Sequence, residues 1–416
     1  MKGTDRRGRR ESVYRSPAKA AEIWSGPIQR LAWGGQGLAQ GPDGRLLLLS
    51  APLALFPGEQ VEAEVRWKSG HGEGVVRRWI TRDPRRVDPF CPAAMECGGC
   101  SLQGAEESRP ELKWDMVRDL LRRQLPGAPP ARWYPAPGDT RRHRVQLHWD
   151  GRALGYHGVR SHRLVPVQAC PAASDPLSRA IPRLAEALEA RVLPPRPQRW
   201  ELATGTPSGE VAATAEDGRS WALAPDGWQP GAPPLWHRHR GVALGHAPGG
   251  FFQACAPWAM EAFAEVLEGW DLRGARLYDL FGGVGLFSAL LGTRFHQRVL
   301  VESEPSAVEW AAENLWSLGL EADIHLADVA RWLPENLGAP GDLVLLDPPR
   351  AGLGPELCGR LRTAGALDLV LVGCDGAAFC RDARDLAPSW RLEALAVLDL
   401  FPWTPHAEFV GRFRRA

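Results

Sequence analysis

The sequence predicts a chain of mixed class, with an N-terminal β unit, a central α+β unit and a C-terminal α/β domain built on a doubly wound parallel sheet. Three observations support this. Short alternating segments separated by turns extend to about residue 82, cysteines cluster in the middle of the chain, and apolar strands alternate with helical patterns from about residue 256. A chain of 416 residues is also too long for a single hydrophobic core. We therefore expect a basic arm at 1–20 and domains at 21–85, 86–250 and 251–416.

Composition indicates a globular protein but gives little information on its partner. The 50 basic and 49 acidic side chains leave a formal net charge of +1, so the total charge does not point to a polyanion. No apolar stretch follows the basic N-terminus, and the longest apolar run, Leu46–Phe56, is interrupted by Ser50 and Pro52. We expect a cytoplasmic protein with no membrane partner. Eight cysteines in a chain of this length do not suggest a disulfide scaffold.

The segment from residue 21 to about 82 is predicted to form a small β-barrel of the OB-like kind. Its strand-like pieces, which Gly and Pro turn signals separate, are Ile28–Leu31, Arg45–Leu49, Gln60–Val65 and Gly74–Trp79. Barrels of this kind commonly hold nucleic acid. Residues 1–90 carry sixteen Lys and Arg against ten Asp and Glu, which fits a nucleic-acid contact or an ordinary solvated surface equally well.

The central part holds a group of cysteines with the spacing C-x5-C-x2-C-x69-C, namely Cys91, Cys97, Cys100 and Cys170. The pair Gly98-Gly99 permits the tight turn that would bring the first three thiols to one centre. Four thiolates suit either zinc or an iron–sulfur cluster, and the spacing alone does not choose between them. The alternative is a set of unrelated buried cysteines.

Two further segments of the central part have a clear pattern. A helix is predicted at 105–125, because Leu112, Met116, Leu120 and Leu121 fall on one stripe. Residues 141–165 are expected to form paired strands with six arginines: Arg141, Arg142, Arg144, Arg152, Arg160 and Arg163. These arginines indicate either a phosphate-contacting face or a solvated strand surface. Residues 172–250 are rich in proline, with strand-like pieces at Trp200–Thr204 and Glu210–Ala215.

The C-terminal part alternates strands and helices, as a doubly wound parallel sheet requires. Strands are expected at Arg276–Leu280, Val299–Val301, Asp323–Leu326, Leu343–Leu346 and Leu367–Val372. Two more, Leu392–Leu400 and Glu408–Phe413, are expected to add antiparallel edge strands.

A glycine-rich turn from Asp279 to Phe287 follows the first of these strands and leads into a helix, as in nucleotide-binding folds. Its G-G-x-G pattern lacks the full dinucleotide spacing, which disfavours NAD. Glu302 ends the second strand, where a carboxylate can accept hydrogen bonds from a ribose. Asp328 follows the third strand, where it could meet an adenine edge, and Asp347 ends the fourth. Together these residues predict an S-adenosylmethionine site, with a generic nucleotide site as the alternative.

Cys374 follows the apolar segment Leu367–Val372, at the kind of strand end where α/β enzymes place reactive groups. A thiol there is a candidate nucleophile, although an isolated cysteine in an apolar context is commonly a small buried hydrophobe. Cys380 lies six residues further on, inside a predicted helix, and is the weaker candidate.

Taken together, these motifs resemble the S-adenosylmethionine-dependent RNA uridine-C5 methyltransferases, in the branch with an N-terminal TRAM domain and a 4Fe–4S cluster. The resemblance extends from about residue 21 to 416 and implies that the C-terminal domain is a Rossmann-like class I methyltransferase domain. It rests on the cysteine spacing and on Phe251-Phe252-Gln253, Asp279 to Ser288, Asp347 to Arg350, Cys374, and Phe401 to Glu408.

The resemblance also implies roles for individual residues. It implies that the four clustered cysteines hold the cluster, that Cys374 is the nucleophile and that Glu408 is the general base. With Asp328 added from its position after the third strand, the expected cofactor-binding residues are Gln253, Asp279, Phe281, Gly283, Gly285, Glu302, Asp328 and Asp347.

Around the nucleophile the chain departs from the family pattern. The family's S-C-N-P motif reads Gly373-Cys374-Asp375-Gly376 here, and its Asn after F-x-Q-x is Cys255. The resemblance implies methylation of a uridine in RNA by a monomeric enzyme, with 23S rRNA favoured over tRNA and DNA not expected as a partner. A catalytically impaired RNA-binding homologue is the alternative that the altered turn suggests.

Overall fold

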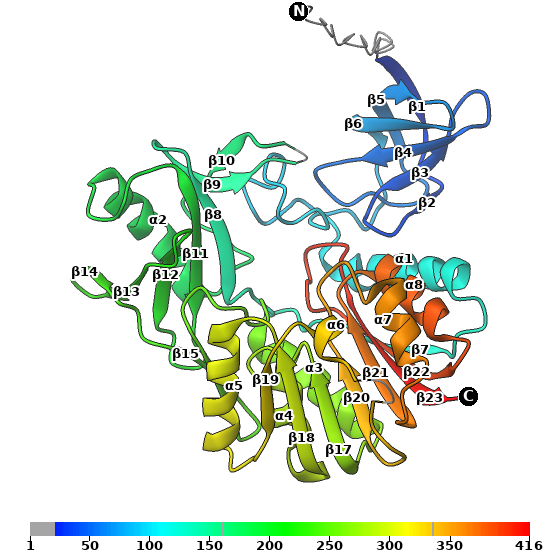
Figure 1. Ribbon diagram of the computed structural model, residues 1–416. Helices are drawn as coiled ribbons and strands as arrows, with labels where there is room; N and C mark the ends of the chain where they lie inside the picture. The colour runs from blue at the N-terminus through cyan, green and yellow to red at the C-terminus, as the bar shows by residue number, and fades with distance from the viewer. Residues whose placement is uncertain (1–20, 160, 335–336) are drawn as a thin grey trace, which may run out of the picture.

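The computed structural model describes residues 21–159, 161–334 and 337–416, so the expected arm at 1–20 and Arg160 lie outside the described residues. Three large sheets and one separate hairpin form the molecule (Figure 1). Among the described residues, no helix is both long enough and apolar enough to cross a bilayer.

The N-terminal sheet has six strands in the order β1-β5-β6-β4-β3-β2. They are β1 (Glu22–Pro27), β2 (Arg30–Leu31), β3 (Gly37–Gln40), β4 (Leu46–Ser50), β5 (Gln60–Trp67) and β6 (His71–Thr81). Each of the four segments predicted from the sequence overlaps a strand, and β1 and β3 are additional. In β5, Val61, Ala63 and Val65 are buried while the residues between them are more exposed, which is the alternation expected of a sheet with one face on a core.

The central sheet has seven strands in the order β10-β9-β8-β11-β12-β13-β14, all antiparallel. Its strands are β8 (Arg144–Trp149), β9 (Leu154–His157), β10 (Leu164–Pro166), β11 (Gln198–Thr204), β12 (Val211–Ala215), β13 (Ser220–Ala224) and β14 (Gly227–Pro230). Helix α2 (Asp175–Glu189) packs on this sheet through Leu177, Ile181 and Leu184, which are fully buried. The paired strands predicted at 141–165 are therefore confirmed. A short hairpin of β15 (Leu235–His239) and β16 (Val242–His246) follows.

The C-terminal sheet has eight strands in the order β19-β18-β17-β20-β21-β23-β22-β7. The strands that the sequence predicts to be parallel correspond to β17 (Gly274–Leu280), β18 (Phe295–Glu302), β19 (Asp323–Leu326), β20 (Leu343–Leu346) and β21 (Asp368–Gly373). All four pairings among them are parallel, so the doubly wound sheet is confirmed. The helices between and around the strands are α3 (Ala256–Gly269), α4 (Leu286–Leu291), η2 (Gly292–Arg294), α5 (Pro305–Ser317), α6 (Val329–Trp332), α7 (Gly354–Leu361) and α8 (Gly376–Leu386).

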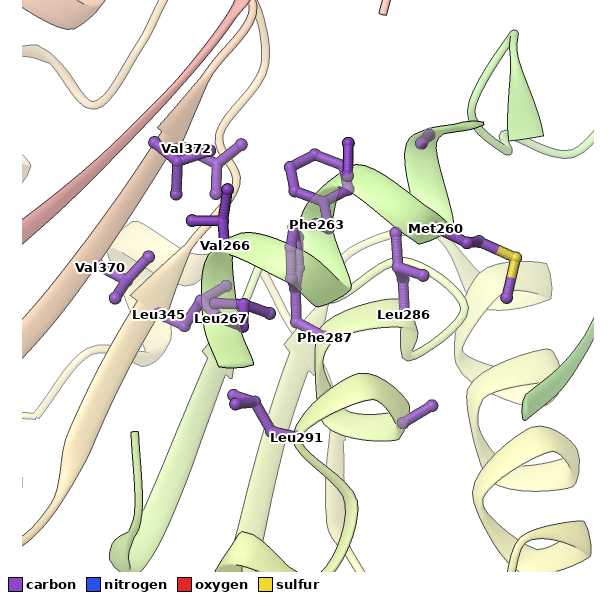
Figure 2. Packing of buried hydrophobic residues seen from close by; sticks show 14 of the residues in the cluster. Met260, Phe263, Val266, Leu267, Leu286, Phe287, Leu291, Leu345, Val370 and Val372 are labelled. Carbon is purple, nitrogen blue, oxygen red and sulfur yellow. The ribbon is translucent and has the colours of Figure 1, made fainter. Parts of the chain in front are cut away.

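Both faces of this sheet are covered. One face packs against α3, α4 and α5. Figure 2 shows part of this packing, with Phe263 of α3, Phe287 of α4 and Val370 of β21 in one buried cluster. Phe263 and Phe287 meet edge to face, with ring centroids 5.0 Å apart. Because α4 is buried in this way, the glycine-rich turn just before it has a fixed starting point.

The opposite face packs against α7, α8 and, from the earlier part of the chain, α1 (Arg109–Gln124), which follows the short helix η1 (Glu106–Ser108). The apolar stripe predicted for α1 is buried as expected. Strand β7 (Ala131–Tyr134) then joins the sheet beside β22 (Trp390–Leu398). Residues 109–134, which the sequence assigns to the central domain, thus complete the C-terminal sheet. Strands β22 and β23 (Glu408–Arg415) are antiparallel as predicted, but β7 covers their edge.

A buried ion pair fastens α1 to this sheet. Lys113 and Asp399, which follows β22, are both fully buried and bonded to each other, and the Lys113 ammonium also donates to the carbonyl oxygen of Phe401 at 2.9 Å. Burial lowers the pKa of Lys113, and Asp399 opposes that effect. The pair therefore orients the start of the loop that leads to Glu408.

Replacing Lys113 by alanine is expected to lower the free energy of unfolding by about 3–5 kcal/mol, because a buried carboxylate is left without its partner. Urea unfolding followed by circular dichroism measures this. Arg118→Ala is the matched control on the same helix, since Arg118 and Asp115 form an exposed pair whose loss should cost less than about 1 kcal/mol. Equal, small losses for the two variants would contradict the role given to the buried pair.

Candidate active site

The carboxyl ends of the parallel strands meet at one edge of the C-terminal sheet, and the predicted site residues gather there. Glu302 ends β18, Asp347 directly follows β20, and Cys374 directly follows β21. Strand order reverses between β17 and β20, since β18 and β19 lie on one side and β21 on the other. Open α/β sheets bind ligands at such a switch point.

The turn after β17 has the backbone conformation of a ligand-binding loop. Phe281, Gly283 and Gly285 all have positive φ, at 61°, 53° and 88°, and a non-glycine residue in this region is uncommon. A Cβ on Gly282 would lie 2.6 Å from the side chain of Leu300, so the loop must lie flat on the sheet. The expected residues Phe281, Gly283 and Gly285 thus form one tight turn against the strand ends.

Two carboxylates tie this turn to the sheet. Asp279 is fully buried and accepts hydrogen bonds from the amide and the hydroxyl of Ser288, at 2.9 and 2.7 Å. Its other oxygen has no partner among the described residues. Glu302 accepts a hydrogen bond from the Gly283 amide at 3.1 Å. Each acid therefore holds one end of the loop, and one carboxylate oxygen of Asp279 is left unused.

The site carries several acids close together. Burial raises the pKa of Asp279 to about 6, with a further contribution from Glu302. Burial raises the pKa of Asp347 to about 7, and Asp279 and Glu302 add to the effect. Burial, followed by the charge of Asp347, raises the pKa of Glu408 well above its usual range. Because each acid disfavours ionisation of its neighbour, a cationic ligand would stabilise all of them.

Cys374 and Glu408 occupy the next positions in the register of two paired strands. Gly373 of β21 pairs with Phe409 of β23 in antiparallel register, so the next residue on each strand, Cys374 and Glu408, is opposite the other. Burial raises the pKa of the Cys374 thiol to about 11, and the Glu408 carboxyl is the next cause. Cys374 also lines a pocket formed with Pro348, Arg350 and Asp375. The Glu408 carboxyl is thus close enough to act on the thiol, while the pocket itself is lined by Cys374 and its neighbours.

Arg350, the last residue of the D-P-P-R motif, is a charged residue near Cys374 to which the sequence assigns no role. Its guanidinium opposes the rise in pKa of both Cys374 and Glu408. It is exposed and follows directly after the two prolines of the D-P-P-R motif. The motif contains this arginine, but its effect on Cys374 and Glu408 depends on how close β21 and β23 lie. The spacing of residues in the sequence does not reveal that closeness.

The altered turn around Cys374, the predicted nucleophile, keeps a helix cap. The side chain of Asp375 accepts a hydrogen bond from the Ala378 amide at 2.8 Å, which caps α8 as an asparagine would. A Cβ on Gly376 would lie 2.6 Å from Leu120 and 2.8 Å from Phe409, so glycine suits the close packing here. Cys374 therefore stands at the N-terminal end of α8, where a helix favours a thiolate.

Three other predicted residues lie apart from this acid cluster or are unsuited to it. Gln253 is half-buried in the segment before α3. Asp328 is exposed and caps α6 by accepting a hydrogen bond from the Arg331 amide at 3.0 Å. Cys380, the weaker nucleophile candidate, is fully buried inside α8 within the apolar cluster beneath the sheet. A thiol placed there has no access to a ligand.

The clustered cysteines line a single cavity together with Arg142: Cys91, Cys97, Cys100 and Cys170. The Arg142 guanidinium donates to the carbonyl oxygen of Gly99 at 2.8 Å and lies 3.8 Å from the Cys100 sulfur. Among the described residues, no three of these sulfurs lie within 4.8 Å of one another; the close group of that kind is instead Cys358, Asp382 and Asp385. Tetrahedral zinc would need its thiolates about 3.8 Å apart, so the four cysteines line the cavity without the close grouping of a zinc-bound set.

The arginine-rich strands are not a uniform phosphate-contacting face. Arg142 points to the cysteine cavity, and Arg144 forms an ion pair at 2.6 Å with Glu201, which is almost fully buried. Arg163 is exposed and paired with Glu96 at 2.8 Å. Neither of the two predicted roles, a phosphate-contacting face or a solvated strand surface, therefore fits Arg142 and Arg144, because the adjoining loop and strand supply acceptors for them.

Comparison with known proteins identifies relatives along nearly the whole chain. The family model for tRNA (uracil-5-)-methyltransferases matches residues 340–413. The 23S rRNA (uracil(1939)-C(5))-methyltransferase RlmD of Chromohalobacter salexigens is 31% identical over 97% of this chain and 91% of its own. The enzyme of the same name from Pseudomonas aeruginosa is 32% identical over 93% of each chain.

A solved structure shows the same fold. It is the tRNA (uracil-54, C5)-methyltransferase of Pyrococcus abyssi in complex with S-adenosyl-L-homocysteine, with a TM-score of 0.73, 24% identity, and coverage of 94% of this chain and 99% of the other. The sequence relatives match over nearly the whole chain, and Cys374 and Glu408 come next in the register of β21 and β23, at the edge where the parallel strands end. On these findings the chain belongs to the RNA uracil-C5 methyltransferase family.

Proposed function

We propose that this enzyme transfers a methyl group from S-adenosylmethionine to carbon 5 of a uridine in 23S rRNA, through a covalent adduct on Cys374. The observation that carries the proposal is the direct opposition of Cys374 and Glu408 across β21 and β23, beside an acid-rich nucleotide loop. One group can serve as nucleophile and the other as base only if both reach the same pyrimidine ring, and this register places them together.

In the proposed reaction, each bond that forms is matched by a bond that breaks. The Cys374 thiolate adds to carbon 6, forming an S–C6 bond and moving the C5–C6 π electrons into an enolate. Carbon 5 then forms a bond to the methyl group. When bound, S-adenosylmethionine supplies that methyl group on a positively charged sulfur, which keeps the bonding pair and leaves as S-adenosylhomocysteine. The Glu408 carboxylate removes the proton from carbon 5, the C5–C6 double bond re-forms, and the S–C6 bond breaks to release the thiolate.

The residues at the strand ends fit a cofactor with a positive charge. We propose that Glu302 binds the ribose hydroxyls, that the turn of Phe281, Gly283 and Gly285 approaches the cofactor backbone, and that Asp279, Asp347, Gln253 and Asp328 complete the site. The raised pKa values of Asp279 and Asp347 support this, because crowded acids gain most from a cation. A neutral nucleotide would leave their mutual repulsion uncompensated.

The affinity for S-adenosylmethionine is expected to rise by about tenfold between pH 6 and pH 8. Asp347 has a pKa of about 7 without ligand, and a nearby sulfonium favours the ionised form. Binding therefore releases a proton at low pH, and affinity falls as the pH drops below 7. Isothermal titration calorimetry at several pH values measures this. S-adenosylhomocysteine, which lacks the sulfonium charge, and the variant Asp347→Asn should both show a flatter profile, and an equal slope for all three would refute the assignment.

For the cysteine cavity we propose a 4Fe–4S cluster held by Cys91, Cys97, Cys100 and Cys170. The donor set fits, since four thiols line one cavity and four thiolates are the usual ligands of such a cluster. Arg142 fits as well, because its guanidinium beside Cys100 would offset the negative charge of a thiolate-bound cluster. No methyl-transfer step is assigned to this cavity.

Anaerobically purified protein is expected to be brown and to contain about four irons per chain. Cys100→Ser should remove the visible absorbance and most of the iron, because it removes one of the four ligands. Iron analysis and visible spectroscopy measure both. Cys380→Ala, which changes a thiol in a distant apolar cluster, is the control and should keep its iron. Colourless wild-type protein with stoichiometric zinc would instead establish the zinc alternative.

The RNA substrate is proposed from the relatives. The two sequence relatives described above are named for 23S rRNA, whereas the solved structure is named for tRNA. We propose that the N-terminal sheet is a TRAM unit that helps to bind this RNA. Incubation with radiolabelled S-adenosylmethionine and unmodified 23S rRNA or tRNA, followed by mapping of 5-methyluridine, tests the choice. Label in a single uridine of 23S rRNA supports the proposal, and label only in tRNA would replace it with the tRNA activity.

A further inference from the structure

The loop Asp399–Ala407 connects β22 to β23 and leads directly into Glu408. It is internally bonded. The carbonyl oxygen of Phe401 accepts from the amide of Thr404 at 2.9 Å and from its hydroxyl at 3.1 Å. The Thr404 hydroxyl in turn accepts from the His406 amide at 3.3 Å. A displacement in the middle of this loop would therefore be passed to the residues next to Glu408.

Trp403 lies in the middle of this loop and is held in place by residues outside the loop. Its side chain is only 7% exposed. The ring of Phe90 meets it edge to face at 4.7 Å, and the guanidinium of Arg109 lies 4.2 Å from its ring centroid. Its carbonyl oxygen accepts a hydrogen bond from the Leu102 amide at 3.1 Å. Three separate contacts, of three kinds, thus fix one tryptophan.

All three contacts come from one stretch, residues 90–109, which also carries three of the four clustered cysteines. Gln103, next to Leu102, is buried, and its side chain accepts from the Cys91 amide at 3.2 Å. The loop with the general base is therefore bonded to the cysteine-bearing stretch through Trp403. On the other side, the turn at Gly35 in the N-terminal unit lies against Pro405.

Strand pairing alone does not fix the position of the Glu408 carboxylate. The register of β23 with β21 and β22 places the main chain of Glu408. Its side chain is 3% exposed, and the loop before it is the part of the chain at the open end of these strands. Removing the proton from carbon 5 needs the carboxylate within hydrogen-bonding reach of that carbon, and a misplacement of about 1 Å can cost about a hundredfold in rate.

We propose that Trp403 is a positioning residue, which holds the loop Asp399–Ala407 against residues 90–109 so that Glu408 can remove the carbon-5 proton. The inference rests on the proposed function, in which Cys374 forms the adduct and Glu408 resolves it. Trp403 contributes nothing to addition or methyl transfer. Its loss therefore slows the last step, in which the C–H bond gives its electrons to the C5–C6 double bond and the thiolate leaves.

The test uses wild type and three full-length variants, Trp403→Ala, Trp403→Phe and Glu408→Gln, with a fourth variant as control, and it measures each step separately. Each is mixed with S-adenosylmethionine and ordinary uridine RNA, and turnover and the fraction of protein in a denaturation-resistant RNA adduct are measured. Trp316→Ala is the matched control, because Trp316 is 77% exposed and far along the chain in α5. Circular dichroism and iron content establish that each variant is folded.

Trp403→Ala is expected to reduce turnover by about 10- to 100-fold and to accumulate the methylated adduct, as Glu408→Gln does. Trp403→Phe keeps an aromatic ring between Phe90 and Arg109 and should restore most of the turnover. A general structural role would lower adduct and turnover together, so a Trp403→Ala protein that is slow without accumulating adduct would overturn the inference. If wild-type protein forms no adduct even with 5-fluorouridine RNA, the proposed function fails instead.

Discussion

Replacing Cys374 by serine is expected to reduce methyl transfer to RNA by at least about 10⁴-fold. A serine hydroxyl is a far poorer nucleophile than a thiolate toward carbon 6, and without that addition carbon 5 does not gain the electron density to attack a methyl group. The structure supports an effect specific to chemistry, since Cys374 lines a pocket at the sheet edge rather than the core. Transfer of labelled methyl groups to 23S rRNA under single-turnover conditions measures it.

Binding should survive the same change. The affinities of Cys374→Ser for RNA and for S-adenosylmethionine are expected to remain within about threefold of wild type, because the substitution exchanges one sulfur atom for oxygen and removes no charge pair. Cys380→Ala provides the comparison, as that thiol is fully buried in α8 and should alter stability more than rate. Full methyl transfer by Cys374→Ser would remove Cys374 from the mechanism.

Glu408→Gln is expected to slow turnover by about 10²- to 10⁴-fold while leaving adduct formation intact. The amide cannot accept the carbon-5 proton, so the methylated RNA stays bound to Cys374. The variant should therefore accumulate a denaturation-resistant complex on ordinary uridine RNA, at up to one RNA per protein. Gel electrophoresis after denaturation, with label in the cofactor methyl group, measures the accumulation. A surface change, Glu309→Gln on α5, should show none.

The same variant tests the electrostatic link between the two groups. The Glu408 carboxyl is one cause of the raised pKa of Cys374, after burial. An amide at position 408 removes that charge, so the thiol pKa should fall from about 11 and alkylation at pH 8 should become faster. The direction follows because a neutral neighbour no longer disfavours the thiolate. Unchanged alkylation would mean that Glu408 places no negative charge beside the thiol at this pH.

Much of the C-terminal sheet can be predicted from the sequence, because buried parallel strands leave a strong pattern. Leu343–Leu346 is an uninterrupted apolar run and forms β20 with those bounds, as expected of a strand covered on both faces. The acids at the strand ends follow from the same pattern, since parallel strands bring their carboxyl ends to one edge. Cys374 could be placed there, but not opposite Glu408, because β23 inserts between β21 and β22.

Other features depend on contacts that spacing does not encode. Helix α2 has Pro176 in its first turn and Pro182 inside it, and proline-rich sequence disfavours a helix until tertiary packing overrides it. Strand β7 joins β22 across more than 250 residues of chain, which no local pattern reports. In the sequence, Arg142 and Arg144 look like surface charges. In the structure, Arg142 donates a hydrogen bond to Gly99 and Arg144 forms an ion pair with Glu201.

The contacts that hold Trp403 in place are likewise not encoded in the spacing of residues along the sequence. Its partners Phe90, Leu102 and Arg109 lie about 300 residues earlier, and a tryptophan in the x position of F-P-x-T has no signature of its own. The gathering of the four clustered cysteines around one cavity, with Arg142 in its lining, also emerges only from the fold.

Mass spectrometry of the adduct formed with 5-fluorouridine 23S rRNA and S-adenosylmethionine tests the central claim most directly. Fluorine at carbon 5 cannot be removed as a proton is, so the complex stops after methyl transfer. We predict a single peptide carrying Cys374 joined to a methylated fluorouridine, at close to one adduct per chain. No adduct under these conditions, or an adduct on any residue other than Cys374, would contradict the account.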